Sequence, residues 1–307
     1  MKNLDYRFDV GIAAISWVND DIPGLGDETT IDEVLSEMHD IGYIATEKGR
    51  TFPDDPNELK DLLGKHDITL ASQFIGIKFS NLGQFEEEFA SFKKQVSFLE
   101  GMGCDYAIVC EMGGSLHWDE TDPDRKEPKK LSSEEWDALV DGLNKAGKYV
   151  QEQGMTLVFH PHAGTVIEQK EDVDKLMERT DERYVHLLYD TGHAYYGNYD
   201  PYEMLITYLD RILYVHYKDV RADILKQTKA EGKSFREEVV EGIFTVPGDG
   251  DIDFRPIMKQ LMETNYRGWV VVEAEQDPAK ANPYDYAKKA KTYLDQTEKE
   301  LREELEK

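Results

Sequence analysis

Four polar clusters each follow a short run of aliphatic and β-branched residues, and they hold the side chains best suited to chemistry. In a closed parallel barrel the carboxyl ends of all strands meet at one mouth, so residues far apart in sequence converge there. Imidazoles and carboxylates that converge on one point are typical of a divalent metal site. The clusters are His160-Pro161-His162, Asp190-Thr191-Gly192-His193, His216-Tyr217-Lys218-Asp219 and Glu273-Ala274-Glu275.

The predicted metal ligands are Glu168, Asp190, His216 and Glu273. Three carboxylates and one imidazole suit Mn²⁺, Co²⁺ or Mg²⁺ better than a metal that prefers thiolates. Asp190 could instead cap a helix. Glu168 lies several residues beyond its strand, so His160 or His162 could take its place. Glu273 is preferred over Glu275 because it directly follows the apolar run.

A second group of polar residues could move protons. Histidine titrates near neutral pH, so His162 and His193 are candidate acids or bases, with Glu275 as a further base. Lys218 shares a strand face with His216, where it could hold an oxyanion or act as an acid. Each also has a plain structural interpretation, as a core histidine or as an ordinary ion pair.

Five further residues at strand ends could contact a substrate. Trp17 and Phe74 lie just beyond the first and third strands, where they could wall a sugar-like ligand or simply fill the core. Glu47, Glu111 and His160 end other strands and would also face the mouth.

The chain alternates strands with helices, which predicts an α/β fold with a parallel sheet. Its 307 residues match one (β/α)₈ barrel, which typically needs about 250, so residues 1–307 are expected to form a single domain. Polar segments near 112–132 and 220–245 are expected as inserts at the mouth. The expected strands are 8–15, 43–46, 68–73, 106–110, 156–160, 185–189, 212–216 and 269–272, with a long helix over 85–102 and a charged helix in the tail 279–307.

Several function classes are excluded or disfavoured. The first strand is followed by Ser16-Trp17-Val18-Asn19, without the glycines of a dinucleotide-binding loop. A formal net charge of −27 argues against nucleic acid as a partner. No apolar stretch is long enough for a membrane span, and the opening Met1–Arg7 lacks the core of a signal peptide. Two cysteines form no disulfide framework, so a cytoplasmic location is expected.

Read together, these segments resemble the inosose dehydratase family, within the xylose isomerase-like barrel superfamily. The resemblance spans nearly the whole chain and is most specific at its opening and its final segment. It is carried by Gly11-Ile12-Ala13 with Ser16–Asp21, Glu33–Met38, Gly42-Tyr43 with Thr46-Glu47, Phe52-Pro53, His160–Thr165, Asp190–His193, Val215-His216 with Lys218-Asp219, and Val271–Pro278.

The resemblance implies a divalent metal, typically Mn²⁺ or Co²⁺ with Mg²⁺ or Zn²⁺ as alternatives, and a small polyhydroxy ketone as substrate. The implied reaction removes water from scyllo-inosose (2-keto-myo-inositol) and gives a trihydroxycyclohexanedione, within inositol catabolism. The main alternative function is a metal-dependent ketose epimerase or sugar isomerase. A DNA-binding endonuclease and a non-enzymatic binding module are weaker alternatives. The chain could also form a homo-oligomer.

Overall fold

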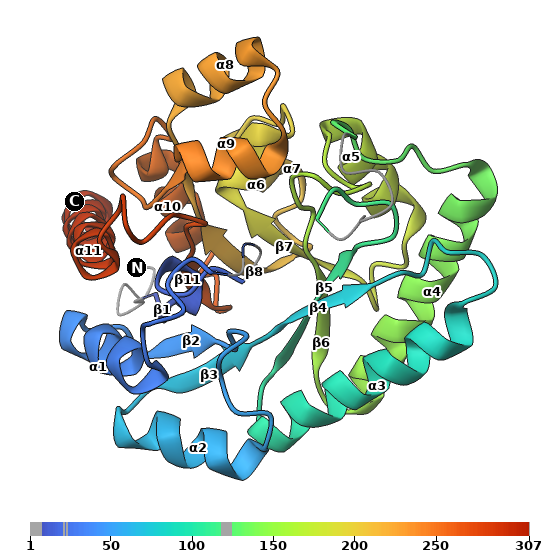
Figure 1. The fold of residues 1–307 in the computed structure, drawn as a ribbon, viewed down its shortest axis with the longest axis horizontal. Helices are drawn as coiled ribbons and strands as arrows, with labels where there is room; N and C mark the ends of the chain where they lie inside the picture. The colour runs from blue at the N-terminus through green and yellow to red at the C-terminus, as the bar shows by residue number, and fades with distance from the viewer. Residues whose placement is uncertain (1–7, 21, 23, 118–124, 307) are drawn as a thin grey trace.

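A ring of parallel strands forms the centre of the computed structural model, which describes residues 8–20, 22, 24–117 and 125–306 (Figure 1). The strand order is β3-β2-β1-β11-β8-β7-β6-β5-β4. The edge strands β3 and β4 are separated in sequence by Gln73 alone, so together they close the ring as one of eight barrel strands. The strands are β1 (Val10–Ile12), β2 (Ala45–Glu47), β3 (Thr69–Ser72), β4 (Phe74–Ile77), β5 (Tyr106–Glu111), β6 (Thr156–Phe159), β7 (His186–Asp190), β8 (Ile212–Tyr217) and β11 (Val270–Val272).

The third barrel strand is longer than the sequence predicts. A strand was expected over 68–73, but pairing resumes after Gln73, where Phe74 pairs with Ile108. The pairing partner changes at this point, because Ser72 is still paired with Glu47 of β2. The apolar pattern of Phe74 to Ile77 continues beyond the polar Gln73, which the sequence interpretation took as the end of the strand.

Helices surround the barrel, and their starts follow ordinary capping chemistry. Thr30 accepts a hydrogen bond from Glu33 N to cap α1, and Ser132 and Glu135 form a capping box at α4. The last helix, α11, packs against α1, which brings the two ends of the described chain to the same side (Figure 1). The surrounding helices are α1 (Ile31–Ile41), α2 (Pro56–Lys65), α3 (Phe85–Met102), α4 (Ser133–Glu152), α5 (Lys170–Arg179), α6 (Thr191–Tyr196), α7 (Pro201–Thr207), α10 (Phe254–Glu263) and α11 (Pro283–Leu305), with a 3₁₀ turn at Ala14–Ser16.

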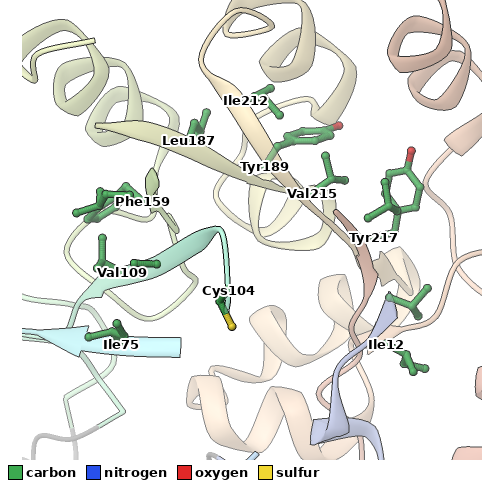
Figure 2. Packing of buried hydrophobic residues seen from close by; sticks show 14 of the residues in the cluster. Ile12, Ile75, Cys104, Val109, Phe159, Leu187, Tyr189, Ile212, Val215 and Tyr217 are labelled. Carbon is green, nitrogen blue, oxygen red and sulfur yellow. The ribbon is translucent and has the colours of Figure 1, made fainter. Parts of the chain in front are cut away.

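Two apolar layers hold this arrangement together. The larger one lies between the strands and the helices, and Figure 2 shows part of it, from Ile12 and Ile75 to Val215 and Tyr217. The smaller one fills the barrel, where small side chains on one side face larger ones on the other. Its buried members are Ala13, Ala45, Ala71, Ile108, Val158, Leu188, Tyr214 and Val271.

The insert expected near 220–245 folds into its own small unit rather than a plain loop. It holds α8 (Ala222–Glu231) and α9 (Phe235–Glu241) between the strands β9 (Asp219–Val220) and β10 (Phe244–Thr245), which pair antiparallel. Of the other insert, near 112–132, residues 118–124 lie outside the described part, as do Met1–Arg7 and Asp21. Within the described ranges, no helix combines the length and apolar character that crossing a membrane requires.

Candidate active site

His216 lies near the end of β8 between two carboxylates, Glu47 at the end of β2 and Glu273 just beyond β11. Its Nε2 atom is 2.7 Å from Glu47 Oε1, and its Nδ1 atom is 2.7 Å from Glu273 Oε2. Tyr214, two residues earlier on β8, donates its hydroxyl to the same Glu47 oxygen at 2.8 Å. All four side chains are buried, so these polar contacts form where the local dielectric constant is low and are stronger than they would be in water.

Lys218 is the centre of a second group of contacts beside the first. Its Nζ atom lies 2.7 Å from Glu273 Oε1, 2.5 Å from Glu275 Oε1 and 2.7 Å from His193 Nε2. The close fit requires glycine at position 192, where a Cβ atom would lie 2.6 Å from Lys218 Cγ. The sequence placed Glu273 and Glu275 on one side of an extended segment, and both carboxylates do reach this buried lysine.

Asp190 uses its two carboxylate oxygens in different ways. Its Oδ1 atom accepts a hydrogen bond from His193 N at 2.8 Å and so caps α6. Its Oδ2 atom lies 3.5 Å from His216 Nδ1 and 3.6 Å from His160 Nε2. The carboxylate therefore starts the helix with one oxygen and turns the other towards two imidazoles.

Several buried polar atoms at this point lack a hydrogen bond. Leaving such an atom unsatisfied costs about 1–3 kcal/mol, so a cluster of them calls for an explanation. One ligand atom from each of His160, Asp190 and His216 lies within 4.8 Å of the others, as an ion shared between them would require. The unsatisfied atoms of the cluster are both ring nitrogens of His160, Asp190 Oδ2, His216 Nδ1 and Glu275 Oε2.

The charge states follow from burial and from the neighbouring groups. Burial lowers the pKa of His160 to about 4, which keeps its imidazole neutral near pH 7. Burial and the neighbouring His193 also hold the pKa of His162 well below its usual range. Burial opposes the charge of Lys218, but Asp190, Glu273 and Glu275 raise its pKa above the usual value. Burial opposes the charge of His216, but Glu47 and Glu273 raise its pKa well above the usual value. The site therefore pairs the neutral His160 and His162 with a charged His216, a buried ammonium and carboxylates.

A cavity of about 300 Å³ opens onto part of this cluster. Phe74 lines it, with its ring edge-on to His160 and His162 at centroid distances of 6.2 Å. Lys218, His193, Glu275 and Asp190 are not among the lining residues, so they lie behind the wall of the cavity. The lining residues from the cluster are Glu47, His160, His162, His216 and Glu273, and Lys48, Arg50 and Gln73 also border the cavity.

Glu168 does not join the other predicted metal ligands. Its carboxylate accepts a hydrogen bond from Gly164 N at 2.6 Å and contacts the Gln169 amide. It lines a different cavity, together with Tyr195 and Lys229. The turn after β6 carries Glu168 away from the strand end, whereas His160 sits directly at that end and lies together with Asp190 and His216.

Two predicted substrate contacts also lie elsewhere. Trp17 is buried in the outer core and donates its indole N–H to Glu37 Oε2 at 2.6 Å. Glu111 is buried at the end of β5, where its carboxylate accepts from Phe79 N, Ser80 N and Gly113 N. Neither residue is among those that line the cavity.

The sequence interpretation missed two residues of this region. Tyr214 precedes His216 by two positions on one strand face, so the period of the strand could have pointed to it. His117 lines the cavity, 5.0 Å from the His162 ring, and its Nε2 atom donates to Ala163 O at 2.9 Å. It follows no strand and lies in a polar insert, so the sequence carried no signal for it.

Comparisons with known proteins agree with this architecture. The family model for the xylose isomerase-like TIM barrel matches residues 35–303, so the chain belongs to that family. The L-ribulose 3-epimerase structure aligns with a TM-score of 0.69 at 14% identity, covering 97% of this chain and 96% of that one. The D-allulose 3-epimerase of Methylomonas sp. aligns with a TM-score of 0.67 at 17% identity, covering 95% and 97%. At these identities the two structures support the fold alone.

Two relatives with higher sequence identity indicate which members of the family this chain is most similar to in sequence. The inosose dehydratase of Geobacillus kaustophilus is 58% identical over 96% of this chain and 96% of its own length. The inosose dehydratase of Clostridium beijerinckii is 45% identical over 93% of this chain and 95% of its own. The resemblance to the inosose dehydratases that the sequence predicted is confirmed.

Proposed function

We propose that this chain is a metal-dependent hydro-lyase that removes water from inosose, the reaction for which its relatives are named. The substrate would be 2-keto-myo-inositol and the product a trihydroxycyclohexanedione. The observation that carries the proposal is the set of buried, unsatisfied ligand atoms at the barrel mouth, which border a cavity sized for a small polyol ketone.

The residues proposed to hold the metal are His160, Asp190, His216 and Glu273. Two imidazole nitrogens and two carboxylate oxygens suit Mn²⁺ or Co²⁺, and the neutral state of His160 leaves its nitrogen lone pair free to bind. When bound, the metal would supply Lewis-acid polarisation of the ketone oxygen, which makes the neighbouring C–H bond more acidic.

His162 is the proposed base for that proton. Its Nδ1 atom donates to Ala163 O at 2.8 Å, which leaves Nε2 as the atom that accepts a proton. The side chain lines the cavity, and its low pKa keeps it unprotonated before the reaction. Glu275 Oε1, 3.6 Å from Nε2, would stabilise the imidazolium that forms.

The same imidazolium would then protonate the departing hydroxyl. The C–H electron pair becomes the new C=C bond, the C–O bond breaks, and the proton leaves with the oxygen as water. Lys218 and His193 lie behind the cavity wall, where they hold Glu275 in place with contacts of 2.5 and 3.3 Å. This arrangement predicts elimination from one face of the ring.

The test is incubation of Mn²⁺-loaded protein with scyllo-inosose while the ultraviolet absorbance of the dione is followed, with chelator-treated protein alongside. We expect metal-dependent dione formation that is lost in H162A. An absence of dione with metal bound, together with an epimerised ketose, would instead assign the site to an epimerase.

A further inference from the structure

A buried chain of three side chains ends on one of the proposed metal ligands. Tyr214 donates its hydroxyl to Glu47 Oε1 at 2.8 Å, and the same oxygen lies 2.7 Å from His216 Nε2. We propose that Glu47 and Tyr214 are positioning residues that fix His216 so that its Nδ1 atom binds the metal. This inference rests on the function proposed above, and it gives Glu47 a role other than the substrate contact that the sequence predicts.

The direction of the hydrogen bond determines which imidazole nitrogen is available. A carboxylate only accepts hydrogen bonds, so the proton in the contact between Glu47 and His216 belongs to Nε2. Nδ1 is the other nitrogen, and it lies 2.7 Å from Glu273 Oε2 and 3.5 Å from Asp190 Oδ2. Nδ1 therefore faces two carboxylate oxygens, and a cation shared with them could take the place of its proton.

The backbone and the barrel interior hold the two positioning residues in place. The register between β2 and β3 shifts between Thr46 and Glu47, and such irregularities re-aim the side chain that follows. Tyr214 belongs to the apolar layer inside the barrel, with its ring 5.5 Å from that of Tyr106. A carboxylate hydrogen-bonded to a metal-binding imidazole fixes its orientation and makes it a better ligand.

The first measurement is calorimetric titration of Mn²⁺ into chelator-treated protein. We expect E47A to weaken Mn²⁺ binding by about 10–100-fold, the usual effect of losing such a partner. E47Q keeps an oxygen that can accept from Nε2 and should weaken binding less than E47A. Y214F should also weaken binding, because it removes the second donor that holds the carboxylate in place.

A matched control exists elsewhere in the chain. Glu238 is also buried and also accepts a hydrogen bond from a tyrosine, Tyr196, at 2.7 Å. E238Q should lower the thermal stability of the metal-free protein while the Mn²⁺ dissociation constant stays at the wild-type value. If E47A behaves like E238Q, with a change in melting temperature alone, Glu47 is only structural and the inference fails.

A second readout reports on His216 directly. In the Zn²⁺-loaded protein, long-range ¹H–¹⁵N correlation spectra distinguish the protonated from the metal-bound ring nitrogen. We expect His216 to carry its proton on Nε2, and binding through Nε2 would overturn the inference. A wild-type protein that binds neither Mn²⁺ nor Zn²⁺ would refute the proposed function itself, whereas tight wild-type binding with unchanged E47A would refute only this inference.

Discussion

Lys218 and Glu275 form a buried ion pair at the mouth of the barrel, with 2.5 Å between Nζ and Oε1. Glu273 contacts the same ammonium at 2.7 Å, and Asp190 lies at 3.6 Å. One lysine therefore offsets part of the charge of three buried carboxylates. Removing one partner of such a group leaves an uncompensated buried charge, which is strongly destabilising.

The first prediction concerns this lysine. K218M keeps much of the side-chain volume but removes the ammonium, so we expect a loss of about 3–5 kcal/mol in the free energy of unfolding of the chelator-treated protein. Adding Mn²⁺ should restore part of this loss, because a cation then returns to the carboxylates. Urea denaturation with and without Mn²⁺ measures both effects.

Its control is K259M, which removes a half-exposed lysine paired with Glu304 at 2.6 Å. Ion pairs at the surface contribute about 0–1 kcal/mol to the free energy of unfolding. A K218M protein as stable as K259M would show that the three carboxylates carry less charge than their contacts indicate.

The second prediction separates the two oxygens of Asp190. D190N keeps an oxygen that can accept from His193 N, so α6 should remain capped. The charge that faces His160 and His216 is lost, and we expect Mn²⁺ affinity and turnover to fall at least tenfold. D190A loses both roles and should also be less stable by about 1 kcal/mol.

Calorimetry and thermal unfolding of the two variants test this division of roles. A D190N protein with wild-type Mn²⁺ affinity would contradict it, since the second oxygen would then be free of any ligand role.

Much of the barrel could be predicted because its strands and helix starts are marked by short, local sequence patterns. Buried strands such as β5 consist mainly of a continuous apolar run, here residues 106–110, and helix starts such as Ser132 carry their own capping residues. A strand-end residue such as Asp190 or His216 could be assigned to the mouth because the topology alone brings it there. The predicted third strand was too short, because the polar residue Gln73 marks a break in the pairing and not the end of the strand.

The remaining residues depend on turns that sequence patterns do not specify. Glu168 follows a turn at Gly164, and its distance from the strand end in sequence did not reveal that its carboxylate bonds the turn itself. Glu111 directly follows an apolar run, yet the chain folds back to cover it. The rule that strand ends face the mouth therefore holds for the backbone, while the local turn decides where each side chain points.

The third prediction tests the corrected place of Glu168. E168A should leave Mn²⁺ affinity within twofold of the wild type, because the carboxylate belongs to a different cavity. The Gly164 N–H loses its acceptor, so we expect a loss of about 1–2 kcal/mol in stability. Calorimetric titration alongside H160A, which should bind Mn²⁺ poorly, gives the comparison. If Mn²⁺ binding is weakened equally in E168A and H160A, Glu168 is a metal ligand after all.

The last prediction uses the buried carboxyl of Glu111. Burial raises its pKa to about 8, against the opposing effect of the donors from Gly113, Ser80 and Phe79. The folded protein therefore binds this proton more tightly than the unfolded chain, whose glutamates have a pKa of about 4.3. The contribution of the Glu111 carboxyl to stability is complete below the unfolded-state pKa of about 4.3. It is lost as the pH rises through the folded-state pKa of about 8.

E111Q cannot ionise, so its stability should vary less with pH than that of the wild type. At pH 6 we expect the variant to be less stable by about 1–3 kcal/mol, because the amide NH₂ meets backbone N–H donors. The difference should shrink by pH 9, where the wild type carries a buried charge. Urea denaturation between pH 6 and 9 measures this, with E100Q, an exposed change in α3, as control. A difference that stays constant between pH 6 and 9 would instead show that the surrounding donors keep Glu111 ionised throughout.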